Sequence, residues 1–98
     1  MKPYHWSEEK NSKLKAERHV SFEDVVASIG DGHLLETTEH PNQGKYLNQK
    51  VYIVQINNYA YSVPFIESHE VFFLKTIFPS RKYTKKYLLD KVEGKTNI

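Results

Sequence analysis

The residues best suited to chemistry are cations near the C-terminal end of the chain. Residues 81–98 carry six lysines and arginines against two acids, a net charge of +4, whereas the rest of the chain is slightly acidic. Such a gradient attracts phosphate chains, although a solvated helix face would show the same pattern. Arg81 opens a predicted helix, and its planar guanidinium can bind two phosphate oxygens at once. Lys82 and Lys85 follow it, and Lys75 interrupts an apolar run before it, so we expect an anionic substrate.

Aromatic residues and histidines supply the other candidates. Trp6 and the seven tyrosines could stack unpaired bases as single-stranded RNA binders do, although most aromatic residues of a small domain belong to its core. The five histidines show neither HxxxH nor HExxH spacing, so a metal site has weak support and no cofactor is expected. His5 and His19 are the better candidates for proton transfer, because they flank the first predicted helix.

Several other classes of enzyme have no support in the sequence. Cysteine is absent, which excludes thiolate catalysis. The GxSxG, GxGxxG and phosphate-binding GK[ST] patterns are also absent, so serine hydrolase, dehydrogenase and nucleotide hydrolase roles are unsupported.

Two helices are predicted before any strand. Ser7 is a good N-cap with two glutamates in the first turn after it, and a mostly charged helix should run over residues 8–18. Ser21 and Asp24 have the spacing of a capping box, which opens the second helix. That helix should bury a stripe of apolar residues at helical spacing, namely Phe22, Val25, Val26 and Ile29.

From residue 33 onward the pattern is that of a sheet. The predicted strands are residues 33–39, 50–56, 59–66 and 71–78. Asn57 and Asn58 should form a two-residue hairpin turn, because both tolerate positive φ. Pro64 cannot donate to a ladder, so we expect a bulge or a strand end there. The last run is apolar on nearly every residue, and we expect it to be buried on both faces near the middle of the sheet.

The order of elements predicts an α+β fold with two N-terminal helices, a four-stranded, mostly antiparallel sheet and a C-terminal helix over residues 81–92. Residues 1–98 should form a single domain whose residues 93–98 fray. No apolar run approaches the ~18 residues that cross a bilayer, and the N-terminus lacks a signal-peptide core. We therefore expect a cytoplasmic protein without a membrane partner.

Three stretches resemble the motifs of a known family. They are residues 4–11 (YHWSEEKN), 20–24 (VSFED) and 77–87 (IFPSRKYTKKY). In this order they resemble the F-E-W-D-x-x-K-N, H-G-V-S-F-x-x-A and I-I-S-A-R-x-A-T-R-x-E stretches of BrnT-type toxins, which are ribonucleases of bacterial type II toxin–antitoxin pairs. The resemblance implies a RelE-like fold, metal-independent RNA cleavage and a ribbon-helix-helix antitoxin as tight partner, often in a two-plus-two assembly.

By motif position, Trp6, Lys10 and Arg81 match positions of the family, and the chemistry of metal-free RNA cleavage gives a hypothesis for the roles of individual residues. Arg81 would stabilise the charged phosphorane that forms when the 2′-hydroxyl of RNA attacks the neighbouring phosphate, and Lys75 or Lys10 would assist it. His19 would carry the proton. The residues expected to bind RNA are Trp6, Arg18, Lys82 and Lys85.

The sequence departs from the family pattern at three places. The basic residue just before the family's Ile-Ile-Ser is matched only approximately by Lys75. The family's Lys-His-Gly is here Glu17-Arg18-His19, so its histidine is replaced by Arg18 or displaced by one residue to His19. The second arginine after Arg81 is Lys85. These departures favour the alternative, a non-catalytic RNA- or protein-binding relative of such toxins.

Overall fold

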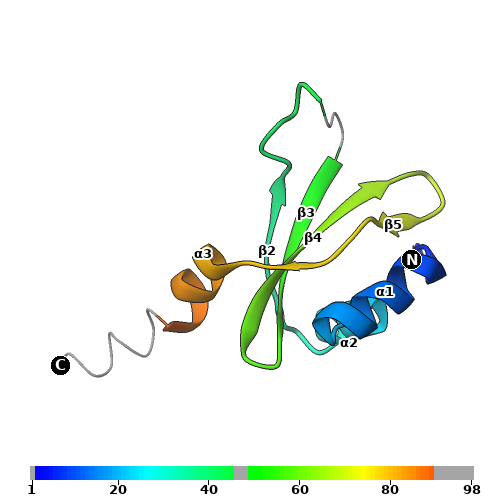
Figure 1. The fold of residues 1–98 in the computed structure, drawn as a ribbon. Helices are drawn as coiled ribbons and strands as arrows, with labels where there is room; N and C mark the ends of the chain where they lie inside the picture. Colours follow the sequence, from blue (N-terminus) through cyan, green and yellow to red (C-terminus); the bar gives the residue numbers. More distant parts are fainter. Residues whose placement is uncertain (1, 46–48, 90–98) are drawn as a thin grey trace.

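The computed structural model describes residues 2–45 and 49–89, which form an α+β fold (Figure 1). Its elements are β1 (Tyr4–His5), α1 (Glu8–Arg18), α2 (Phe22–Gly30), β2 (Leu34–Glu39), β3 (Gln49–Ile56), β4 (Tyr59–Glu67), β5 (Phe72–Leu74), β6 (Phe78–Pro79), α3 (Arg81–Thr84) and η1 (Lys85–Leu89), a turn of π-helix that continues α3. The predicted fold class is confirmed, but the sheet has six strands rather than the predicted four, because residues 4–5 also pair as a strand and residues 71–78 divide into two strands. The predicted end of the last helix and the predicted frayed tail lie outside the described residues.

Both N-terminal helices begin at the residues that local capping predicts. The Ser7 hydroxyl accepts a hydrogen bond from the backbone N–H of Lys10 at 3.2 Å. In α2, the Ser21 hydroxyl accepts from the N–H of Asp24 at 3.1 Å, and the Asp24 carboxylate accepts from the N–H of Ser21 at 3.0 Å. These caps satisfy N–H groups that have no partner within a helix, which is why short-range sequence signals suffice to locate the helices.

The strands lie in the order β1-β5-β4-β3-β2, and β6 pairs with β4 beyond the end of β5. The pairs β2–β3, β3–β4, β4–β5 and β4–β6 are antiparallel, whereas β1 pairs with β5 in parallel. The long strands β3 and β4 are joined at Asn57 and Asn58, whose φ values are +52° and +66°. The predicted hairpin turn is thus confirmed, since asparagine tolerates the positive φ that such a turn needs.

The two faces of the sheet are covered by different helices. Side chains alternate along β3, so Tyr52, Val54 and Ile56 face the helical hairpin formed by α1 and α2. This side of the sheet is called the hairpin face below. Val51 and Ile53 point to the other side, called the α3 face, where Tyr83 of α3 packs on them. The hairpin face holds most of the core, made of Leu14, Val20, Phe22, Val25, Tyr52, Val54, Ile56, Val63, Phe65, Leu74 and Ile77.

The prediction that residues 71–78 form one doubly buried central strand is wrong. The segment divides into β5, which is three residues long, and β6, which is two residues long. The strand β5 lies beside the edge strand β1 rather than in the middle of the sheet. Phe73 and Phe78 are 37% and 41% exposed, so this apolar run is not buried on both faces.

Pro64 explains why the strand is interrupted. It pairs with Val51 inside an unbroken β3–β4 register, so neither the expected bulge nor the expected strand end occurs in β4. Strand β5 pairs with residues 65–67 and β6 pairs with residues 61–62, which leaves Pro64 facing the gap between them. Its carbonyl accepts from the Lys75 N–H at 2.8 Å on that side. The missing N–H of proline therefore falls where the neighbouring strand is broken, and no ladder bond is lost.

Candidate functional site

The basic helix is attached to the sheet at one buried residue of β4. The Ser80 N–H donates to the Ala60 carbonyl at 2.9 Å, and the Ala60 N–H donates to the Thr84 hydroxyl at 2.8 Å. The Ser80 hydroxyl also caps α3 by accepting from the N–H of Tyr83. Ser80 and Thr84 of the third motif stretch therefore have structural roles, and they hold the cations between and after them in a fixed position.

Two of those cations are unpaired. The side chains of Arg81 and Lys85 are exposed and make no hydrogen bond or ion pair within the described part of the chain. Lys82 differs, because its ammonium group lies 5.3 Å from the centroid of the Tyr83 ring. Lys86 lies 5.8 Å from the same ring and 3.4 Å from a carboxylate oxygen of Glu36. Arg81 and Lys85 are thus the cations of α3 and η1 that remain available to an anion.

The tyrosines of α3 and η1 form a fixed aromatic surface. The rings of Tyr83 and Tyr87 are stacked, with centroids 6.2 Å apart and an angle of 16° between their planes. The Tyr87 hydroxyl donates to the Glu36 carboxylate on β2. This hydrogen bond lowers the pKa of Glu36 below its ordinary value of 4.5 and raises the pKa of Tyr87, and the charges of Lys86 and Lys82 lower the pKa of Glu36 further.

A second cluster of predicted residues lies where the helical hairpin meets the segment after β5. Arg18, the last residue of α1, donates through Nη1 to the carbonyl of Ile77. Ile77 itself is fully buried in the hairpin-face core. This contact joins the end of α1, with His19, to the segment that carries Lys75. His19 and Lys75 are exposed, and neither side chain has a hydrogen bond or ion pair among residues 2–45 and 49–89.

The residues of the first motif stretch have mainly structural surroundings. Trp6 is half-buried and stacks on Phe22 with ring centroids 5.6 Å apart. Asn11 is 1% exposed and its side chain connects α1 to α2. The Asn11 Oδ1 atom accepts from the Phe22 N–H, and the Asn11 Nδ2 atom donates to the Glu23 carboxylate, each at 2.8 Å. Lys10 is exposed on α1. The parts assigned to Trp6 and Lys10 in RNA binding and catalysis stay predictions.

A groove on the α3 face was not predicted. It encloses about 550 Å³ between α3 and the end of β2, and its lining residues are Thr38, Glu39, His40, Pro41, Val51, Ile53, Ser62, Pro64, Phe78, Lys82 and Tyr83. No local motif marks it, because its floor depends on the register of β2, β3 and β4. The sequence indicates only part of it, because the alternation of side chains along β3 and β4 places Val51, Ile53 and Pro64 together on the α3 face.

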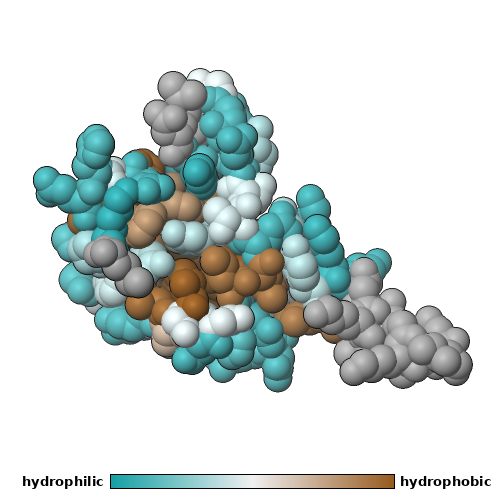
Figure 2. Space-filling view, turned by 180° about the vertical axis from the view of Figure 1, so that it is seen from behind, coloured by the Kyte–Doolittle hydropathy of each residue, from teal (hydrophilic) through white to brown (hydrophobic). Residues whose placement is uncertain are grey.

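Three of the large exposed apolar residues also belong to the α3 face. Ile66 of β4 and Phe73 of β5 are register partners. Ile66 follows the core residue Phe65 and Phe73 precedes the core residue Leu74, so both point away from the hairpin face. Phe78 pairs with Ser62 and lines the groove. Figure 2 shows apolar residues gathered over the middle of the side turned away in Figure 1, with hydrophilic residues around them. Several exposed apolar residues on one face mark a binding surface more often than a single exposed apolar residue does.

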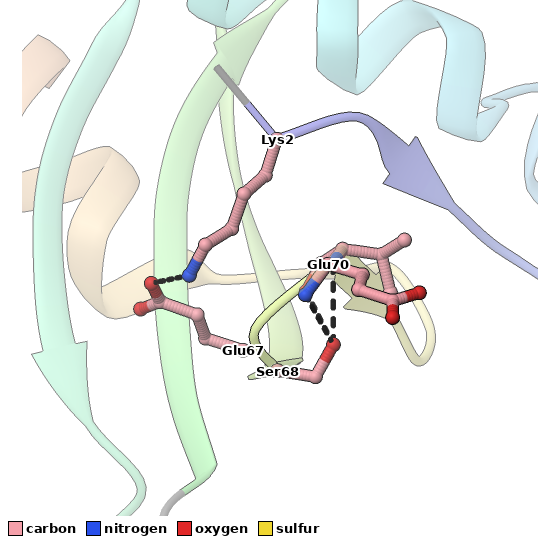
Figure 3. A network of polar contacts seen from close by, with 5 residues as sticks. Lys2, Glu67, Ser68 and Glu70 are labelled. Carbon is pink, nitrogen blue, oxygen red and sulfur yellow. Dashed lines mark hydrogen bonds and ion pairs between the residues drawn. The ribbon is translucent and has the colours of Figure 1, made fainter.

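A smaller and more open pocket lies near the N-terminus, lined by Lys2, Lys50, Glu67, Ser68 and His69. Three of its lining residues, Lys2, Glu67 and Ser68, are engaged in local structure (Figure 3). Lys2 pairs with Glu67, and the hydrogen bond lowers the pKa of that carboxyl. The Ser68 hydroxyl accepts from the N–H groups of Glu70 and Val71 at 3.3 and 3.1 Å, which shapes the turn before β5. These contacts explain the cluster without a ligand.

Within the part of the chain that the structure describes, no three histidine, aspartate or glutamate side chains are grouped so as to hold a metal ion. No described helix is long and apolar enough to cross a membrane. The sequence matches no family model, and it matches neither a curated protein nor a solved structure.

Proposed function

We propose that this protein is a metal-independent endoribonuclease of the BrnT type, the toxin of a type II toxin–antitoxin pair, with a ribbon-helix-helix antitoxin as partner. The α+β fold is compatible with the RelE-like fold that this assignment requires. The proposal combines the resemblance of the three motif stretches with the free cations on the surface of the molecule.

The main support for this proposal is the proximity of the second and third motif stretches in the folded chain. The second and third motif stretches meet in the core, and Arg18, two residues before the second stretch, donates to the carbonyl of Ile77 across 59 residues of sequence. Val20 and Phe22 share the core cluster that buries Ile77. Such a contact is expected if the two stretches are parts of one site. It also leaves Lys75, His19 and Arg81 exposed, with no protein partner in the described ranges.

The chemistry needs three functions and no metal. A base takes the proton of the RNA 2′-hydroxyl, a cation stabilises the charge on the phosphorane, and an acid protonates the leaving 5′-oxygen. Arg81 is the proposed cation, since a guanidinium can bind two phosphate oxygens. Lys75 and Lys10 are proposed to assist, and His19 is the proposed proton carrier. The products would be a 2′,3′-cyclic phosphate and a free 5′-hydroxyl.

A non-catalytic RNA- or protein-binding relative is the second candidate, and the backbone of His19 favours it. His19 has φ +58°, the left-handed conformation that glycine adopts most readily. His19 therefore corresponds best to the glycine of the family's Lys-His-Gly, and Arg18 to its histidine. A guanidinium keeps its proton at physiological pH and cannot transfer it as imidazole does. Catalysis then depends on His19 acting from the neighbouring position.

Expression in bacteria from a tightly controlled promoter separates the two candidates. The parent should arrest growth and fragment cellular RNA, Arg81→Ala should do neither, and Lys13→Ala should behave as the parent because Lys13 is an exposed lysine on α1 with no contact among the described residues. Normal growth and intact RNA with the parent, when folded protein is present, would assign the chain to the binding relatives.

A further inference from the structure

The groove on the α3 face has the chemical make-up of a site for a flat ring with polar edges. Its floor is formed by a row of register partners, Thr38, Val51 and Pro64, with Ile53 and Ser62 in the next row. Apolar groups thus make the floor, with two hydroxyl groups beside them. A mostly apolar concavity of about 550 Å³ with a few polar groups falls in the usual range for small-molecule and nucleotide sites.

Two aromatic side chains form the walls. Tyr83 lines the groove and is fixed by the stack with Tyr87, which is itself held by Glu36. Phe78 lines it from β6 and is 41% exposed, although a phenylalanine in a monomer of this size is usually buried. The exposed Phe78 ring can stack on an unpaired base, because every base presents a flat π-face. Tyr83 is half-buried, with its ring stacked on Tyr87 and close to Lys82, so it forms a rigid wall of the groove.

Ser62 adds a hydroxyl group to the lining of the groove. The residue is 7% exposed and its hydroxyl makes no hydrogen bond in the described part of the chain. This hydroxyl is open to the groove, since the buried side-chain atom left without a partner among the described residues is Nε1 of Trp6. A donor and acceptor in one group can bond to the edge of any base.

The charges at the groove favour a nucleic acid over an apolar protein segment. Lys82 lines the groove on the side of α3, and Arg81 next to it has no partner among the described residues, whereas Glu39 at the end of β2 is the carboxylate of the lining. A phosphate attached to a base in the groove would find these cations within the same helical turn. An apolar protein segment would bury Lys82 without offering it a negative charge, which is costly.

We propose that the α3 groove binds one nucleobase of single-stranded RNA, stacked on Tyr83 and Phe78 and hydrogen-bonded to Ser62, with its phosphate at Lys82 and Arg81. The proposal rests on the proposed function for the identity of the ligand, and it makes the groove the place where base preference is set. The hairpin end, with His19 and Lys75, is not needed for this step.

The test measures binding with cleavage blocked. Hexanucleotides of each of the four bases, fluorescein-labelled and carrying 2′-fluoro sugars that cannot attack the phosphate, are titrated with protein and followed by fluorescence anisotropy. The parent should bind at least one of them. Phe78→Leu and Tyr83→Leu should each raise its Kd about tenfold or more, because stacking contributes that much per base. Ser62→Ala should change the order of preference among the four bases.

Matched controls come from the same molecule. Phe73→Leu changes a phenylalanine of similar exposure on the same face, and Tyr59→Leu changes a half-buried tyrosine; neither lines the groove. Both should leave the Kd unchanged. Amide NMR spectra establish that each variant is folded, and Ser62→Ala provides a milder change if a ring variant unfolds.

Three outcomes would overturn the groove proposal: no RNA binds the parent, Phe78→Leu binds as the parent does, or Phe73→Leu weakens binding as much as Phe78→Leu. Unchanged RNA affinity in all groove variants would leave the surface to a protein partner. Cleavage of unmodified RNA is assayed separately. Binding with the expected variant pattern but without cleavage rejects the proposed function and retains the groove, whereas cleavage with unaffected groove variants does the reverse.

Discussion

At the scale of single residues, a substitution of His19 can distinguish an effect on stability from an effect on RNA cleavage. It ends α1 in the left-handed conformation, which costs a residue with a side chain about 1 kcal/mol relative to glycine. We therefore expect His19→Gly to raise the free energy of unfolding by about that amount. Chemical denaturation of the two proteins measures it.

His33→Gly is the control for this prediction. His33 is also exposed, but its φ is not positive, so glycine there should lower stability through the greater entropy of the unfolded chain. A His19→Gly protein that is more stable but cleaves RNA more slowly would identify the imidazole as a participant in the reaction. Lower stability of His19→Gly would contradict the strain assigned to this residue.

At the scale of elements, α3 depends on its attachment to β4. The Ala60 N–H is buried, and the Thr84 hydroxyl is its hydrogen-bond acceptor. Thr84→Val keeps the shape of the side chain but leaves this donor unpaired, which should lower the free energy of unfolding by about 1–3 kcal/mol. Thermal or urea denaturation gives the value, and amide hydrogen exchange at Ala60 should accelerate.

The matched control is Thr37→Val, since Thr37 is an exposed threonine of β2 with no side-chain hydrogen bond in the described ranges. It should cost little or nothing, because valine suits a strand at least as well as threonine does. Equal losses in the two variants would mean that the Ala60–Thr84 bond does not hold the helix.

The elements that the sequence predicts well are those with local causes. Ser7 and Ser21 cap helices through bonds that span three residues, and Asn57 and Asn58 form a turn by themselves. The interruption of the strand over residues 71–78 has a cause outside that segment, the missing N–H of Pro64 in the neighbouring strand. A pattern of apolar residues along one segment cannot reveal where its neighbour lacks a donor.

At the scale of the whole molecule, three carboxylates should make stability depend on acid pH. Hydrogen bonds from Asn11, Tyr87 and Lys2 lower the pKa values of Glu23, Glu36 and Glu67 below the ordinary value of 4.5. The unfolded chain then binds protons at higher pH than the folded one. Stability is therefore complete above about pH 5.5 and is lost as the pH falls through 4.5 toward the folded pKa values.

The free energy of unfolding measured by urea denaturation from pH 7 to pH 3 checks this dependence. Glu36→Gln should flatten part of the decline, because the pKa of that carboxyl differs between the folded and unfolded states. Glu17→Gln removes an exposed carboxylate with no contact in the described part of the chain. It should leave the pH dependence of the free energy of unfolding unchanged. An identical decline in the two variants would contradict the role of Glu36.

The candidate site could be predicted only in part from the sequence. The cations Arg81, Lys82 and Lys85 could be recognised from charge and helical spacing alone. The contact of Arg18 with Ile77, and the groove that places Ser62 beside Tyr83, arise from the folded chain as a whole. The sheet register and the path of the segment between β5 and α3 bring these residues together, and neither follows from local patterns.

Cleavage of a defined RNA by the purified protein in excess chelator, with analysis of the ends formed, tests the assignment as a metal-independent ribonuclease. We predict fragments with 2′,3′-cyclic phosphate and 5′-hydroxyl ends, a rate that does not change when metal is removed, and a loss of about 10²–10³-fold for Arg81→Ala but none for Lys13→Ala. Intact RNA, products with 5′-phosphate ends, or an Arg81→Ala protein as fast as the parent would contradict it.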